Sequence, residues 1–237
     1  MIQPREGCMV HDFTAFESAI VVEFKNKELL TQAFVHRSYL NEHPDFPLGH
    51  NERLEFLGDA VVELVVTEYL YKHYENPEGE LTNWRASLVN ANMLAEIAKE
   101  IGAEPFLLLS RGEAKETGKA RQYILANAFE AIVGAIYLDQ GLRVSRTFLH
   151  RVLLPKLPNI LTNRLYIDAK SKFQEIAQDR IGVTPSYKVL DESGPDHAKQ
   201  FIVGIYLGGE LVAKGAGLSK QEAQMDAATK GLQAKGW

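Results

Sequence analysis

Residues 51–59 of the 237-residue chain read NERLEFLGD, and this stretch decides how the sequence is interpreted. At about 100° per residue in a helix, Glu52, Glu55 and Asp59 fall within roughly 60° of one another. Like charges at these spacings repel by roughly a few tenths of a kcal/mol per pair, and a divalent cation would relieve that repulsion. The same periodicity predicts an apolar stripe on the opposite side of the helix, made of Leu54, Leu57, Val61, Leu64 and Val65.

A second stretch, ILANAFEAIVGAIYLD at residues 124–139, offers a counterpart. Asn127 and Glu130 are three residues apart and share one helix face. Ala131 and Gly134 sit beside them, so another helix can approach closely. Oxygen ligands suit Mg²⁺ or Mn²⁺ better than zinc or copper. Two facing helices would therefore gather one oxygen-rich site from Glu52, Glu55, Asp59, Asn127 and Glu130.

The spacing of the acidic residues leaves alternatives open. Acidic helix faces are usually only solvated, and Glu63 falls on the same face, so periodicity does not say where a site ends. Phe56 projects near the acidic side, away from the main apolar stripe. It is either a peripheral core residue or an aromatic contact for a partner surface, which would indicate a dimer.

Composition is that of an ordinary globular protein, with 46% hydrophobic and 24% charged residues. No apolar run approaches the roughly 18 residues of a membrane span, and no signal peptide is recognisable. A single cysteine, Cys8, excludes a disulfide within the chain and favours a cytoplasmic location. No association with a membrane is expected. The net charge of −5 lies entirely before residue 168, because residues 168–237 are balanced. Such an acidic excess is either a solvated surface or a set of carboxylates gathered to hold a cation, and only the positions of the acids decide between the two.

The pattern predicts two domains joined by a linker. Residues 10–155 read as an all-α domain, and residues 156–167 as a linker, because paired prolines favour extended backbone. Residues 168–237 read as an α+β domain of order α-β-β-β-α, with both helices on one face of an antiparallel sheet. The predicted elements are a helix at 169–180, strands at 186–190, 200–207 and 210–214, and a helix at 219–234.

These features resemble bacterial ribonuclease III. NERLEFLGDA at residues 51–60 matches the signature of that family, and FVHRSYLNE at 34–42 resembles the stretch before it. Residues 75–90 and 124–141 resemble the connecting segment and the second acidic helix, and residues 168–237 resemble a double-stranded RNA-binding domain. The resemblance implies an all-α ribonuclease III-like endonuclease domain followed by an α+β RNA-binding domain.

The resemblance also implies roles for single residues in the first domain. Asp59 and Glu130 match catalytic residues, and the metal ligands would be Glu55, Asp59, Asn127 and Glu130. Glu52 matches an accessory acidic residue that helps to place substrate or metal. Glu78 matches a carboxylate that is donated towards the cleft of the partner subunit. Phe56 matches an aromatic side chain that enters a socket on the other protomer.

In the second domain, the resemblance implies contacts to RNA. Gln174 and Glu175 match first-helix residues that reach a minor groove, whereas Pro195 and His197 match the loop that reaches the next one. The start of the last helix supplies Ser219 and Lys220, where the helix dipole also favours phosphate. From the residue alone, His197 is more simply a histidine of a surface loop.

The expected function is cleavage of double-stranded RNA by a homodimer with Mg²⁺, for which Mn²⁺ can substitute. Two-metal-ion hydrolysis would leave 5′-phosphate and 3′-hydroxyl ends. Expected substrates are ribosomal RNA precursors and other structured transcripts, including messenger and transfer RNA precursors. Most family members carry Asp where Asn127 stands, and Asn lacks the charge and one ligand atom. The alternative is therefore a non-cleaving protein that binds double-stranded RNA and retains the fold.

Overall fold

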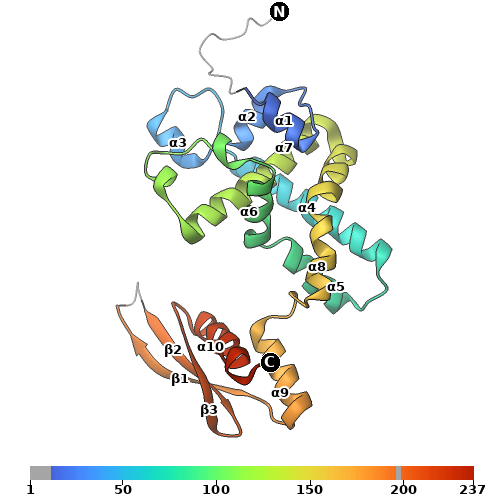
Figure 1. The fold of residues 1–237 in the computed structure, drawn as a ribbon. Coiled ribbons are helices and arrows are strands. Elements are labelled where there is room, and N and C mark those ends of the chain that lie inside the picture. Colours follow the sequence, from blue (N-terminus) through green and yellow to red (C-terminus); the bar gives the residue numbers. More distant parts are fainter. Residues whose placement is uncertain (1–11, 196–198) are drawn as a thin grey trace, which may run out of the picture. The chain divides into compact units, whose positions relative to one another are not determined.

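The computed structural model describes residues 12–195 and 199–237, which form two compact units. The first unit is Met1–Asn163 and the second is Arg164–Trp237. In the described residues the first unit is built from helices, and the second contains a three-stranded sheet and two helices (Figure 1). The predicted fold class, an all-α domain followed by an α+β domain of order α-β-β-β-α, is confirmed.

The first unit contains α-helices and short 3₁₀ helices (Figure 1). The α-helices are α1 (Thr14–Ile20), α2 (Lys27–Ala33), α3 (Arg37–Glu42), α4 (Glu52–His73), α5 (Glu78–Leu88), α6 (Ala91–Glu100), α7 (Gly118–Val152) and α8 (Leu157–Thr162). The 3₁₀ helices are η1 (Glu104–Phe106), η2 (Glu113–Lys115) and η3 (Leu154–Lys156).

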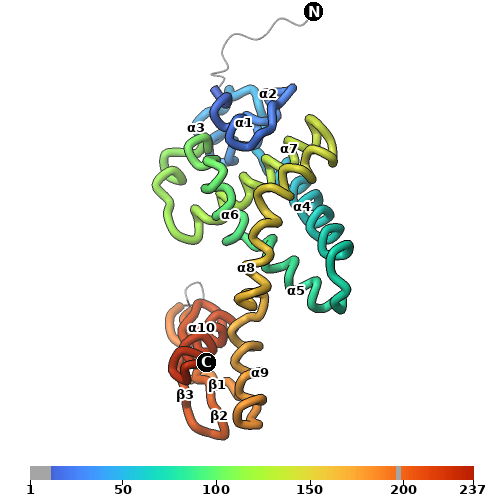
Figure 2. The backbone as a smooth tube through the Cα atoms, turned by 45° about the vertical axis from the view of Figure 1, so that its right-hand side comes forward, coloured from blue at the N-terminus to red at the C-terminus, as the bar shows by residue number. Residues whose placement is uncertain are grey.

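Helix α7 is the centre of the first unit, with α4 and α6 packed against it (Figures 1 and 2). From Ile124 to Ile136 almost every side chain of α7 is buried, and only Asn127 and Glu130 are half-buried. A helix that is apolar on nearly all sides is stable only inside a core. The left-handed backbone of Gly141, with φ of 79°, then interrupts the regular helix.

Helices α4 and α7 cross in backbone contact at Gly58 and Gly134. A Cβ atom on Gly58 would lie 1.7 Å from the carbonyl oxygen of Glu130, and one on Gly134 would lie 2.2 Å from that of Leu54. No other residue lacks the Cβ atom, so only glycine permits this approach. The close contact expected beside Ala131 and Gly134 is confirmed. The part played by Gly58 was not predicted.

The predicted apolar stripe of α4 is wrong at Leu64, whose exposed fraction is 53%. Leu57 is only half-buried. The crossing at Gly58 sets which direction of α4 faces the core, and Leu64 lies roughly 120° from it. Glu55 lies roughly 60° away on the other flank, so the carboxylates border the buried stripe instead of opposing it. The buried residues of α4 are Leu54, Gly58, Val61, Val62, Val65, Val66 and Leu70.

The second unit has the predicted elements, and two strands are longer than expected. It comprises α9 (Ala169–Ile181), β1 (Ser186–Ser193), β2 (Gln200–Leu207), β3 (Glu210–Gly217) and α10 (Lys220–Lys235). The strands are antiparallel in the order β1-β2-β3. Both helices begin with a side-chain cap, because Asp168 and Ser219 accept hydrogen bonds from backbone N–H groups of the first turn.

Alternate residues of β2 form the core of the second unit. Phe201, Val203, Ile205 and Leu207 are buried, and they pack with residues of both α9 and α10. Both helices therefore cover the same face of the sheet, as expected. Gly208 and Gly209 have φ values of 54° and 93°, which suit a two-residue hairpin turn.

The segment predicted as a linker, residues 156–167, is partly helical. It contains α8, in which Leu157 and Ile160 are buried, and the first unit ends at Asn163. Pro158 lies in the first turn of α8, where a proline removes no helical hydrogen bond. The paired prolines therefore begin a helix here instead of extending the chain. The domain limits at 155 and 168 stay predictions.

Replacing Gly58 by alanine should destabilise the first unit, because the new methyl group meets the backbone of α7. Overpacking of this kind costs about 1–3 kcal/mol, and more where backbone must move. Denaturant unfolding followed by helical circular dichroism measures the loss. Gly79→Ala is the matched control, since a Cβ atom there has no neighbour within 4 Å. Equal effects of the two substitutions would contradict the assigned contact.

Candidate active site

The crossing of α4 and α7 brings acidic side chains from both helices together. Glu55 and Asp59 flank Gly58 on α4, and the backbone of Glu130 on α7 touches Gly58 itself. Glu130 is half-buried, whereas Asp59 is exposed. The site therefore opens to solvent on the α4 side and is closed by the core on the α7 side.

Electrostatic coupling shows which carboxylates face one another. Burial, followed by the charges of Asp59, Glu55 and Glu63, raises the pKa of Glu130 to about 8. Burial also raises the pKa of Glu55, with further contributions from Glu52 and Asp59. Both shifts mean that negative charge accumulates here at a cost to the folded protein. A carboxyl whose pKa is raised by burial together with specific charged neighbours is a candidate functional group.

The three central carboxylates have no counter-charge of their own. In the part of the chain that the structure describes, no basic side chain forms an ion pair with Glu55, Asp59 or Glu130. The outlying acids differ. Glu52 lies 3.5 Å from Arg37 and 3.7 Å from His50, and Glu63 lies 2.9 Å from Arg85. Within this acidic cluster, the carboxylates without an ion pair are therefore those at the crossing.

The donor set at the crossing fits a hard divalent cation. Asn127 lies one turn before Glu130 on α7, is half-buried, and adds an amide oxygen to the carboxylates. Oxygen ligands of this kind suit Mg²⁺ or Mn²⁺. Within residues 12–195 and 199–237, however, no three His, Cys, Asp or Glu side chains already converge on a metal position.

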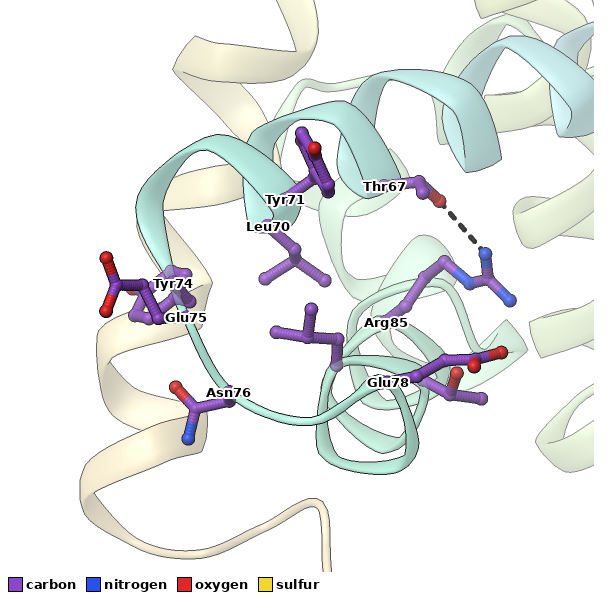
Figure 3. A pocket seen from close by; sticks show the side chains of 10 residues that line it. Thr67, Leu70, Tyr71, Tyr74, Glu75, Asn76, Glu78 and Arg85 are labelled. Carbon is purple, nitrogen blue, oxygen red and sulfur yellow. Dashed lines mark hydrogen bonds between the residues drawn. The ribbon is translucent and has the colours of Figure 1, made fainter.

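Two further predicted site residues of the first unit are not part of this cluster. Glu78 is the first residue of α5 and lines a pocket of about 690 Å³ beside the C-terminal half of α4 (Figure 3). The charge of Glu78 is not among those that raise the pKa of Glu130. Phe56 is 82% exposed on α4, so its interpretation as a peripheral core residue is wrong.

Asn51 was not predicted to contribute to the site, yet it fixes the start of α4. Its side chain is buried and donates a hydrogen bond of 3.1 Å to the carbonyl of Ala33, while its backbone N–H donates to Val35 at 2.8 Å. These bonds hold the N-terminal end of α4, and with it Glu52 and Glu55, to the turn between α2 and α3. No periodicity reveals such a role.

In the second unit, the proposed RNA contacts lie at the surface where they are described. Gln174 and Glu175 are exposed on α9, and Glu175 pairs with Arg164 at 2.9 Å. Ser219 caps α10, and Lys220 is exposed with its ammonium 5.7 Å from the ring centre of Phe201. Pro195 is exposed. His197 lies outside the described residues.

Comparison with known proteins assigns both units. Residues 26–157 match the family model described as Ribonuclease-III-like, and residues 169–235 match the double-stranded RNA binding motif. Ribonuclease 3 of Syntrophomonas wolfei is 47% identical over 211 residues, which cover 89% of each chain. The chain belongs to the ribonuclease III family. The sequence-based identification as a double-stranded RNA-specific endoribonuclease is therefore confirmed.

Further ribonuclease III relatives agree with this assignment. Ribonuclease 3 of Desulforamulus reducens is 44% identical over 212 residues, covering 89% of this chain and 86% of the relative. The nuclease domain of the Campylobacter jejuni enzyme is 40% identical, with a TM-score of 0.56. It covers 62% of this chain and 99% of that domain, and its description names a region involved in dimer formation.

Replacing Glu130 by Gln should change how the stability of this ribonuclease III protein depends on pH when chelator removes metal. The folded state holds the proton on Glu130 more tightly than the unfolded chain, because its pKa rises from 4.5 to about 8. The wild-type free energy of unfolding should therefore fall, relative to Glu130→Gln, as pH rises through that interval. Urea unfolding of both proteins between these pH values tests this. Parallel curves would contradict the assigned pKa.

Proposed function

We propose that this ribonuclease III cleaves double-stranded RNA by hydrolysis that depends on two divalent cations held where α4 crosses α7. The observation that carries the proposal is the set of three carboxylates without a counter-charge, with burial and neighbouring charge raising the pKa of Glu130 to about 8. Folding tolerates such a cluster at a cost, and cation binding offsets that cost.

Each residue of the crossing has a separate part in this mechanism. Asp59 and Glu130, whose charges interact across the two helices, would be the central ligands, with Glu55 and Asn127 at the flanks. Mg²⁺ or Mn²⁺, when bound by these residues, would activate a water and stabilise the leaving oxygen. Glu52, held near Arg37 and His50, would orient substrate at the edge of the site. The products would carry 5′-phosphate and 3′-hydroxyl ends.

The surface of α4 supports a homodimer. Its exposed apolar side chains are Phe56, Leu64 and Tyr71, with exposed fractions of 82%, 53% and 81%. They fall within about 80° of one another around the helix, so they form one stripe. A two-fold axis near Leu64 would place two such stripes antiparallel, with Phe56 of one protomer beside the partner's Tyr71.

The pocket beside α5 is the natural socket for Phe56 in that arrangement. Its lining includes Leu70, Tyr71, Tyr74 and Leu81, which offer an apolar surface to an aromatic ring (Figure 3). Glu78 lines the same pocket. When Phe56 of the partner subunit enters, Glu78 comes close to the acidic residues that neighbour that phenylalanine. The dimer therefore gives Glu78 a site in the partner, as the resemblance implied.

The second unit would hold the RNA duplex by its shape. Domains of this type span about 16 base pairs through minor-groove hydroxyls and the phosphates between them. The N-terminal end of α10 presents Lys220, and α9 presents Gln174 and Glu175. Binding through a separate unit explains how a nuclease with a net charge of −5 engages a polyanion.

Natural substrates and location stay predictions. Processing of ribosomal RNA precursors and other structured transcripts in the cytoplasm is what the family resemblance implies. Across the helices that the structure describes, none has the length and apolar character required to cross a membrane.

The deciding experiment is incubation of the full chain with a long RNA duplex, with and without Mg²⁺. We expect cutting only with Mg²⁺ or Mn²⁺. Glu130→Gln should abolish cutting, because a central ligand is lost, yet leave duplex binding nearly unchanged, since the second unit is intact. Gel analysis of the products and a filter-binding titration measure the two properties. Metal-independent cutting would refute the mechanism.

Asn127→Asp is the matched variant that separates an enzyme from a non-cleaving binder. It restores a charged ligand at the crossing, so half-maximal cutting should need less Mg²⁺ than in the wild type. A wild type that binds duplex without cutting, together with an active Asn127→Asp variant, would establish that the asparagine has converted the chain into a binder.

Replacing Phe56 by alanine should weaken the dimer, because the ring no longer fills the partner's pocket. Burying an aromatic side chain contributes about 1.5–3 kcal/mol to the stability of a contact. The proposed dimer has two symmetric contacts of this kind, so the variant should shift towards monomer. Sedimentation velocity over a range of protein concentrations measures it. Tyr123→Ala is the control, since Tyr123 is also an exposed aromatic of this unit. An unchanged dimer would refute the proposed contact.

A further inference from the structure

Helix α5 is joined to α4 by a forked polar side chain, in addition to the ring contact of Trp84 with Tyr74 at the end of α4. The Nε atom of Arg85 lies 2.9 Å from a carboxylate oxygen of Glu63, and its Nη1 atom donates a hydrogen bond of 3.0 Å to the hydroxyl of Thr67 (Figure 3). Glu63 and Thr67 are one turn apart on α4. The two acceptors therefore match the two edges of the guanidinium group, which fixes both the position and the rotation of α5.

Glu78 depends on α5 for its position. It precedes Arg85 by seven residues, which is about two helical turns, so both side chains lie on one face of α5. Both line the same pocket (Figure 3). Among the described residues, Glu78 has no hydrogen bond or ion pair of its own, and Pro77 provides no side-chain cap before it. Its carboxylate is placed only by the helix that carries it.

We propose that Arg85 is a positioning residue that sets Glu78 for the acidic site of the partner subunit. The inference rests on the dimer of the proposed function, in which Glu78 acts in the partner. Without the fork, α5 keeps the apolar contacts of Trp84 and Leu88 but loses the two polar bonds that constrain its rotation against α4, so its first turn with Glu78 can shift. Misplacement of a catalytic group by about 1 Å can cost a hundredfold in rate. Lysine cannot replace the fork, because its single ammonium cannot satisfy both acceptors in this geometry.

A role within the same protomer is the competing explanation. Glu63, the partner of Arg85, is one of the charges that act on Glu130. Removing Arg85 would leave Glu63 unpaired beside the metal ligands of its own subunit. If Arg85 positions Glu78, its loss damages the active site of the partner subunit. If Arg85 acts through Glu63, its loss damages the active site of its own subunit. Dimers made of two different protomers distinguish the two explanations.

Mixed dimers provide the test. Arg85→Ala protomers and Glu130→Gln protomers are co-expressed with different affinity tags, and the mixed dimer is purified through both. The Arg85→Ala homodimer should cut about tenfold to a hundredfold more slowly than wild type, and the Glu130→Gln homodimer should not cut. In the mixed dimer, the intact acidic cluster of the Arg85→Ala protomer receives a correctly placed Glu78 from its partner. Cutting should therefore return to about half of the wild-type rate, as one of two symmetric sites is restored.

The opposite result identifies the competing role. If Arg85 acts through Glu63 on its own subunit, both sites of the mixed dimer are defective, and the absence of recovery overturns the inference. A mixed dimer of Glu78→Gln and Glu130→Gln is the reference. Recovery in the reference but not with Arg85→Ala refutes the role of Arg85 alone. No recovery in the reference refutes the action of Glu78 in the partner, and the inference with it.

Two further variants exclude general damage. Arg143→Ala removes an exposed arginine from α7, beyond Gly141, and should leave the rate of cutting unchanged. Arg85→Lys keeps the charge and should behave like Arg85→Ala in homodimers and mixed dimers; it also serves if the alanine variant does not dimerise. A wild-type rate for Arg85→Lys would contradict the need for a fork. Duplex affinity should stay unchanged in every Arg85 variant, so that the loss appears in the rate of cutting.

Discussion

The contact between the backbones of α4 and α7 at Gly58 and Gly134 is the constraint on which the site depends. Side chains on two crossing helices normally keep the helix axes about 8–10 Å apart. Here a Cβ atom on either glycine would overlap a carbonyl oxygen of the other helix. The short separation brings Glu130 of α7 within electrostatic range of Glu55 and Asp59. Without it, the acids would remain two separate solvated faces.

That geometry also explains the distribution of charge in the protein. The acids at the edge of the crossing are paired with Arg37, His50 and Arg85, whereas the central carboxylates are not. The unfavourable energy is therefore concentrated at the place where a cation can relieve it. The negative charge of this surface repels a phosphodiester. Bound cations would make the local electrostatic potential positive, so that a phosphodiester could then approach. Binding of RNA by a second unit separates affinity from chemistry.

The sequence predicted those features that are local or periodic. The helix of Glu52, Glu55 and Asp59, the alternation of Phe201, Val203 and Ile205, and the Gly208-Gly209 turn all follow from short-range rules. Leu64 was assigned to the core because periodicity gives the faces of a helix but not which one turns inward. The bonds of Asn51 and Arg85 join segments far apart in the chain, so no spacing within one helix could indicate them.

The reciprocal contact of the two glycines limits how the protein can change over evolution. Each glycine opposes main-chain atoms of the other helix, not a side chain. A larger residue at either glycine cannot be compensated by a smaller side chain elsewhere, because substitution does not change the size of a backbone carbonyl group. The surrounding core can drift through compensating pairs of apolar replacements, but the crossing cannot. Substitutions at the side chains around the crossing would leave the distance between the two helices unchanged.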